Sequence, residues 1–254
     1  MLVAAAVCPA PPLLVPAVAA GAAPELAAAR AACGEALDGL AAARPDRLVV
    51  VGPAERAAPG TYPRGTVGSF RGFGVAVDVV LGGTGGTGGT GAPDGADAPD
   101  DAPDGTARTL PASLAVAAWL LERVRWSAAP VSGVAVAEDL ATDACVRTGR
   151  ELAGGADRVA LLVMGDASAC RTLKAPGYLD DRAAGFDAAV AGALAAADPA
   201  ALTALDAELA AELKAAGRAP WQVLAGAAEG AGLGGALLYE DAPYGVGYLV
   251  ATWS

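Results

Sequence analysis

Short apolar runs alternate with longer amphipathic segments along most of this chain. Runs rich in Val, Leu and Ala that are too short for isolated helices predict strands at 2–8, 47–52, 75–81, 131–137, 158–164, 235–239 and 246–252. Segments whose apolar residues recur three and four positions apart predict helices at 22–44, 110–126, 139–153, 181–197 and 219–230. One or two short helices are expected within 199–216, with Asp198 as the N-cap and Pro199 as the first helical residue.

The order of these segments predicts the fold class. Strands alternate with helices over the first two thirds of the chain, which favours a mostly parallel sheet with helices on both faces. The last two strands are joined by a short hairpin-like connection, so they can add an antiparallel member. We therefore predict one α/β domain spanning residues 1–254, with three α/β/α layers and a mixed, mainly parallel sheet.

Residues 82–108 differ from the rest of the chain in composition. This stretch is rich in Gly, Thr, Asp and Pro, and 82–106 holds no bulky apolar residue, so it cannot bury enough surface to offset its ordering entropy. Its glycines resemble a phosphate-binding loop only superficially, because the Gly-Lys-Ser/Thr ending is absent. We predict a disordered insertion within the domain.

Charge and cysteine content narrow the function classes. The net charge of −11 argues against nucleic acid and against anionic membrane surfaces as partners. Four separated cysteines without a CxxC pair are typical of reduced, buried thiols in a cytosolic protein; they are Cys8, Cys33, Cys145 and Cys170. Prolines interrupt the apolar N-terminus, and no uninterrupted apolar run reaches the roughly 18 residues of a spanning helix. We expect a cytoplasmic protein with no membrane partner.

The richest candidate chemistry follows the predicted strand at 158–164. The carboxyl ends of parallel strands share one edge of an open α/β sheet, where ligands usually bind. The loops at that edge predict a ligand pocket made of Cys8, Glu55, Asp166, Ser168, Cys170, Arg171, Glu240 and Tyr244. The candidates for a catalytic role are Asp166, Ser168, Arg171 and Lys174.

Several uses of this pocket remain open from the residues alone. Zn²⁺ could bind Cys8, Cys170 and Asp166, and Mg²⁺ or Mn²⁺ could bind the oxygens of Asp166, Glu55 and Glu240. Cys170 could act as a nucleophile beside Arg171 and Lys174, or these two cations could capture a carboxylate or phosphate. The simplest interpretation is structural: Asp166 holds its loop by accepting backbone N–H bonds.

Five segments in order carry a family resemblance over nearly the whole chain outside the Gly-rich stretch. They are AVCPAPPLLVP, VVVGPA, GSFRGFG, MGDASACR and YEDAPYGVGYLVATW. Together they resemble the class III extradiol ring-cleavage dioxygenases of the LigB type. The resemblance is greatest to a group of Ala-rich actinobacterial proteins called dioxygenase-like, and it implies the LigB-like scaffold.

The resemblance also implies an iron site that this chain cannot build. Active members of the family hold Fe(II) with two histidines and a carboxylate, and use further histidines as acid and base. Alanine occupies the histidine positions of three motifs, at Ala10, Ala54 and Ala169, and the chain has no histidine at all. An oxygenase facial triad needs two neutral imidazoles, so Fe(II)-dependent ring cleavage is not expected.

Two hypotheses about function follow. The first is a catalytically degenerate pseudoenzyme that binds a small anionic or aromatic molecule, or acts as an interaction module, without a cofactor. The second is an active enzyme of different chemistry that uses the carboxylate, Arg and Lys side chains, with or without an oxygen-ligated divalent metal. Because members of the resembled family pair with other proteins or with themselves, a homo-oligomer is also an expectation.

Overall fold

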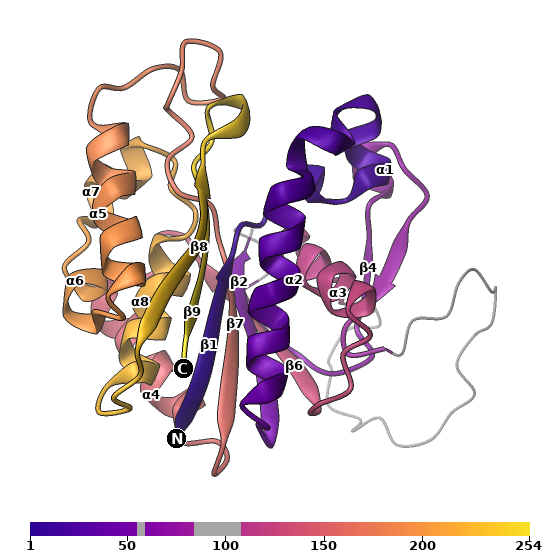
Figure 1. The fold of residues 1–254 in the computed structure, drawn as a ribbon, viewed down its shortest axis with the longest axis vertical. Helices are drawn as coiled ribbons and strands as arrows, with labels where there is room; N and C mark the ends of the chain where they lie inside the picture. Colours follow the sequence, from indigo (N-terminus) through magenta and orange to yellow (C-terminus); the bar gives the residue numbers. More distant parts are fainter. Residues whose placement is uncertain (55–58, 84–107) are drawn as a thin grey trace.

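A mixed sheet of seven strands forms the centre of the computed structural model, which describes residues 1–54, 59–83 and 108–254 (Figure 1). The strand order is β3-β6-β2-β7-β1-β9-β8. The strands are β1 (Leu2–Cys8), β2 (Arg47–Ala54), β3 (Gly60–Tyr62), β6 (Val131–Ala137), β7 (Val159–Met164), β8 (Gly235–Asp241) and β9 (Tyr248–Trp253). The neighbours β6, β2, β7 and β1 are parallel, whereas β3, β9 and β8 pair antiparallel. The predicted parallel core with an antiparallel closing pair is confirmed.

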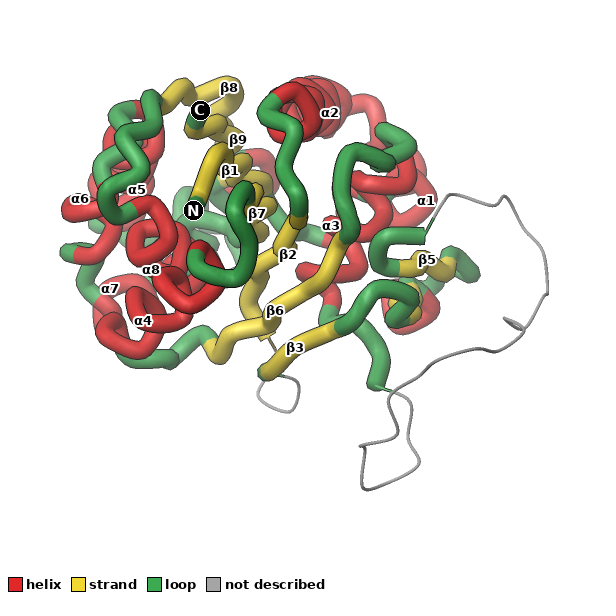
Figure 2. The backbone as a smooth tube through the Cα atoms, turned by 90° about the horizontal axis from the view of Figure 1, so that it is seen from below, coloured by secondary structure: helices red, strands yellow, loops and turns green. Residues whose placement is uncertain are grey.

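Helices cover both faces of this sheet, which confirms the three-layer α/β prediction (Figure 2). One layer contains α2 (Ala27–Ala42) and α3 (Ala112–Arg123). The other contains α4 (Thr142–Ala153), α5 (Ala183–Ala195) and α8 (Arg218–Ala228). The shorter helices are α1 (Pro16–Ala19), α6 (Pro199–Thr203) and α7 (Ala207–Glu212). Within the described ranges, no helix is long and apolar enough to cross a bilayer.

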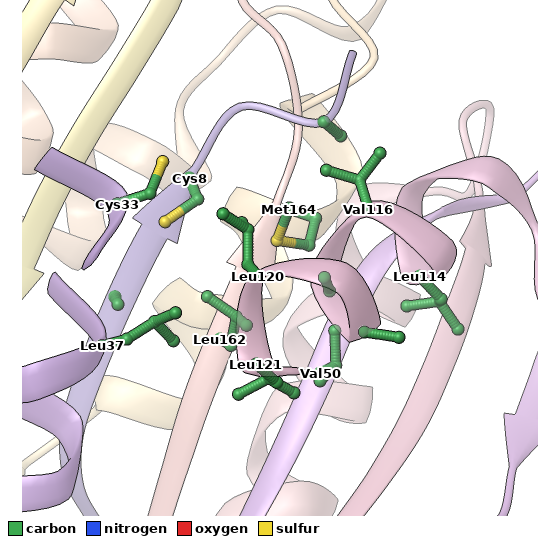
Figure 3. Packing of buried hydrophobic residues seen from close by; sticks show 14 of the residues in the cluster. Cys8, Cys33, Leu37, Val50, Leu114, Val116, Leu120, Leu121, Leu162 and Met164 are labelled. Carbon is green, nitrogen blue, oxygen red and sulfur yellow. The ribbon is translucent and has the colours of Figure 1, made fainter. Parts of the chain in front are cut away.

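Each central strand buries side chains on both faces because helices lie above and below it. Cys8 and Met164 point towards α2 and α3, whereas Val7 and Val163 point towards α4, α5 and α8. Figure 3 shows the first of these clusters, in which Leu and Val from α3 pack onto β2 and β7. Aliphatic side chains therefore fill most of the core, and the largest fully buried side chains are those of Trp221, Trp253, Tyr62, Tyr248 and Phe70.

Helices α4 and α8 cross at two glycines in close backbone contact. A Cβ added to Gly149 would lie 2.0 Å from the carbonyl oxygen of Val223, and one added to Gly226 would lie 2.1 Å from that of Val146. No side chain fits at either position, because the obstructing atoms belong to the backbone. The loop before α8 meets the end of β7, where the Gly217 N–H donates to the Asp166 carbonyl at 2.9 Å.

The helix predicted at 22–44 is wrong in its first turns. The structure has a 3₁₀ segment, η2 (Ala20–Leu26), followed by α2. Pro24 lies inside η2 and has no backbone N–H to donate to an α-helical bond. The α-helix therefore begins only at Ala27.

The region between β2 and α3 also differs from prediction. The strand predicted at 75–81 is only β5 (Asp78–Val80), which pairs with β4 (Val67–Ser69) in a separate two-stranded sheet. The segment predicted as a loop at 53–68 contains β3 and the first two residues of β4. Three-residue strands are too short to show a periodic pattern. The predicted insertion falls almost entirely at 84–107, outside the described residues.

Candidate functional site

The carboxyl ends of β1 and β7 bring two of the motif-bearing loops into contact. These strands run side by side, with Cys8 opposite Met164. The Gly165 N–H donates to the carbonyl of Cys8 at 3.0 Å, and the Ala10 N–H donates to Oδ1 of Asp166 at 2.8 Å. Asp166 is therefore held at the sheet edge by the chain that follows β1, as the structural interpretation of its role expected.

The Asp166 carboxyl has an ionisation suited to proton transfer. Burial raises its pKa from 3.8 to about 7, and the hydrogen bond from Ala10 opposes the shift only in part. The carboxyl therefore changes charge near neutral pH. Groups with this property at a strand end are candidates for acid–base or ligand-binding roles.

Tyr248 lies close enough to Asp166 for the two groups to influence each other's charge. Tyr248 of β9 is buried, and its pKa is raised first by burial and then by the charges of Asp166, Tyr244 and Tyr239. The Tyr244 hydroxyl donates to Oε2 of Glu25 at 2.7 Å, which joins the β8–β9 connection to η2. The edge thus contains phenol hydroxyls as well as a titrating carboxyl.

Ser168 and Arg171 are turned towards a buried carboxylate on α5. The backbone N–H and the hydroxyl of Ser168 donate to the two oxygens of Asp187 at 2.8 and 2.9 Å, and Nη1 of Arg171 donates at 2.9 Å. The Asp187 side chain is 2% exposed and that of Arg171 is 30% exposed. Ser168 and Arg171, two of the four residues predicted to be catalytic, therefore hold the loop in place. The Ser168 hydroxyl is fully buried and is not accessible to a substrate.

The segment just before β9 completes this loop through its backbone. The Ala167 N–H donates to the Gly247 carbonyl, the Gly247 N–H to the Ser168 carbonyl, and the Arg171 N–H to the Gly245 carbonyl, at 2.8, 2.8 and 3.0 Å. A Cβ on Gly247 would lie 2.5 Å from Oδ2 of Asp187. Glycine at this position thus allows β9 to approach the Asp187 cluster.

The structure does not bring Cys8 and Cys170 together. Cys8 lies in the cluster facing α2, where its thiol hydrogen-bonds with Cys33, and its pKa is raised by this contact and by burial. Cys170 lies in the opposite cluster, and its thiol donates to the Leu213 carbonyl. Burial is the main cause of the raised pKa of Cys170, which disfavours a reactive thiolate. Neither the zinc grouping nor the nucleophile hypothesis finds support in this arrangement.

The remaining predicted residues lie at the periphery or cannot be placed. Lys174 is exposed on the loop after β7, and Glu240 is exposed near the end of β8. Glu55 lies outside the described residues. In the parts of the chain that the structure describes, no three Cys, Asp or Glu side chains converge as a metal site would require.

Sequence reasoning missed Asp187, Tyr248, Cys33 and Glu25. A signal existed for Asp187, because it lies among Phe186, Val190 and Leu194 on the buried side of α5. A charged residue on an apolar helix face is rarely buried without a partner. Nothing in the local pattern identified Glu25, whose contact with Tyr244 spans 219 positions.

Comparison with known proteins assigns no family to the chain. No protein-family model matches it, and no curated protein matches it. Among solved structures, its fold is similar to that of an uncharacterized protein, JW3007, from Escherichia coli K12. That match covers 99% of this chain and 100% of the other at 14% sequence identity, with a TM-score of 0.49. This degree of likeness identifies neither a family nor an activity.

Proposed function

We propose that this chain is a class III extradiol dioxygenase-like protein that has lost the iron site and binds a small molecule at the edge bearing Asp166. One observation carries the proposal. The alanines at the three expected histidine positions lie at or just beyond the carboxyl ends of three neighbouring parallel strands, β1, β2 and β7. They are Ala10, Ala54 and Ala169. The positions that would hold the missing imidazoles therefore follow strands that share one edge of the sheet.

The ionisation of Asp166 supports a ligand with an anionic or hydroxylated aromatic group. Below pH 7 the carboxyl is protonated and can donate a hydrogen bond to an anion, whereas above pH 7 its charge repels one. Tyr248 stays protonated through this range, because its pKa is raised. An anionic ligand held by Asp166 should bind more tightly at pH 6 than at pH 8.

Calorimetry with benzoate as an anionic aromatic probe and catechol as a neutral one tests this proposal. Benzoate should bind the wild-type protein more weakly at pH 8 than at pH 6, and this difference should disappear in Asp166→Asn. Oxygen uptake with catechol and added Fe(II) should stay at the background rate. Stoichiometric iron in protein purified from its own host, together with catechol turnover, would overturn the proposal.

One observation favours the alternative of an active enzyme. A carboxyl that titrates near pH 7 can serve as a general acid or base at physiological pH. In this alternative Asp166 is the proton-transfer group, and Ser168 and Arg171 position the loop through Asp187. Turnover that follows the ionisation of Asp166 and is lost in Asp166→Asn would select this alternative over a binding module.

A further inference from the structure

Tyr248 is a buried tyrosine whose hydroxyl has no hydrogen-bond partner among the described residues. The residue is 1% exposed. A buried tyrosine hydroxyl usually finds a partner, and leaving it without one costs free energy. Trp253 of the same strand shows the usual case, since its indole N–H donates to the Leu194 carbonyl at 2.7 Å. The Tyr248 hydroxyl is therefore free to bond a ligand.

Backbone hydrogen bonds hold Asp166 next to Tyr248. The Gly247 N–H donates to the Ser168 carbonyl, and the Gly247 carbonyl accepts the Ala167 N–H, both at 2.8 Å. The residue before Tyr248 is thus bonded to the two residues that follow Asp166. The charge of Asp166 also acts on Tyr248, which requires the two groups to be close. The two side chains therefore belong to one site.

The residues around this pair lie on the face of the sheet covered by α2. Val250, two positions after Tyr248, belongs to the cluster on that face, and alternate residues of a strand share a face. Ala10, whose N–H donates to Oδ1 of Asp166, belongs to the same cluster. Among the described residues Ala10 is the only hydrogen-bond partner of the Asp166 side chain, so Oδ2 remains free. Asp166 is partly exposed, which gives a ligand access to this oxygen.

Two hydrogen-bond donors side by side suit a carboxylate. The Tyr248 hydroxyl donates one hydrogen bond, and the Asp166 carboxyl donates a second through Oδ2 when it is protonated. Each oxygen of a ligand carboxylate can accept one of these bonds, and hydrogen bonds to an ionised acceptor are the stronger ones. When Asp166 is ionised it accepts hydrogen bonds and repels an anion. The same pair then suits a neutral group that carries a donor and an acceptor, such as an amide.

We propose that the Tyr248 hydroxyl and the Asp166 carboxyl together bind the carboxylate of the ligand, each donating a hydrogen bond to one of its oxygens. This inference rests on the function proposed above. It narrows the ligand from an anionic or hydroxylated aromatic molecule to a carboxylic acid, and it makes Tyr248 a binding residue.

The other ionisable groups around the pair are already engaged within the protein. Each of them forms a hydrogen bond to another part of the chain; they are Cys8, Glu25, Cys33, Asp187, Tyr239, Asp241 and Tyr244. The two phenols and the Cys8 thiol have raised pKa values, so they stay protonated up to pH 8. Asp166 is therefore the group whose titration between pH 6 and pH 8 should control binding.

Tyr248→Phe tests this arrangement by calorimetry, with benzoate and its neutral isostere benzamide as probes. Wild-type protein should bind benzoate about tenfold more weakly at pH 8 than at pH 6, because a carboxyl with a pKa of about 7 loses its proton in this range, whereas benzamide should not weaken. At pH 6 Tyr248→Phe should weaken benzoate binding about tenfold or more, the loss expected for one hydrogen bond to a charged group. Tyr178→Phe is the control, because Tyr178 is exposed on the loop after β7, and it should leave the benzoate affinity unchanged.

Urea unfolding at pH 6 without ligand separates binding from folding. Because the Tyr248 hydroxyl has no partner, Tyr248→Phe should keep the stability of the wild type or raise it. A loss of stability with unchanged benzoate affinity would show that the hydroxyl serves the fold, and would refute the inference. So would benzoate binding that depends on Asp166 but is equal in Tyr248→Phe and wild type. If benzoate does not bind the wild-type protein at either pH, the proposed function fails and this inference fails with it.

Discussion

Replacing Asp166 with Asn isolates the effect of its ionisation on stability. The pKa of this carboxyl is about 7 in the folded chain, against 3.8 as its ordinary value. The folded state therefore binds the proton more tightly than the unfolded state, and stability falls as pH rises from about 4 to 7. Asn remains neutral at every pH and keeps an oxygen that can accept the Ala10 N–H.

The size of the effect follows from proton linkage. With these two pKa values, ionisation of Asp166 opposes folding by about 1.7 kcal/mol at pH 5 and about 4.3 kcal/mol at pH 8. The change between the two pH values, about 2.6 kcal/mol, is an upper limit because the side chain is only partly buried. Relative to wild type, Asp166→Asn should therefore gain about 1 to 2.6 kcal/mol more stability at pH 8 than at pH 5.

Urea unfolding at both pH values measures this difference directly. Asp38→Asn provides the control, because Asp38 is an exposed carboxylate on α2, and its effect should be nearly the same at pH 5 and pH 8. If the stability difference between Asp166→Asn and wild type does not change with pH, the carboxyl is not held in a proton-binding environment, and the pH-dependent part of the ligand proposal fails with it.

Three further predictions concern the scaffold. Gly226→Ala should lower the free energy of unfolding by about 3 kcal/mol or more, because the added Cβ would lie 2.1 Å from a backbone oxygen. A loss below about 1 kcal/mol would contradict the close contact between α4 and α8. Asp187→Ala should cost about 3 to 5 kcal/mol in urea unfolding, because it leaves Arg171 and the buried Ser168 without their acceptor, whereas Asp187→Asn should cost less. All four thiols are buried, so a thiol reagent such as DTNB should react only after unfolding; rapid labelling of the native chain would show that one of them is accessible.

The sequence predicted the inner strands well because their burial leaves a continuous apolar run. β1 and β6 begin and end where expected, at Leu2–Cys8 and Val131–Ala137. By contrast, β3, β4 and β5 have three residues each, and their pairing depends on neighbours distant in the chain. Tertiary contacts, and not local propensity, decide such strands.

In the candidate site, too, strand order predicts some features and tertiary contacts decide others. The position of Asp166 beside the end of β1 could be predicted, since parallel strands end at a common edge. The role of Ser168 could not, because it depends on Asp187, a residue of a helix that follows the loop and packs back against it. Sequence reasoning placed the polar groups at one edge, but it could not determine which of them bond to each other.

The three backbone bonds from the Asp166–Arg171 loop to Gly245 and Gly247 have a consequence for synthesis of the chain. Domains emerge from the ribosome N-terminus first, so the parallel strands are made before the segment that fastens this loop. A nascent chain that ends before Gly245 can pair β1, β2, β6 and β7 and still leave the loop unfastened. The loop that bears Asp166 is therefore fastened only after the parallel core has been made, and loss of the segment from Gly245 onward would remove both this fastening and β9.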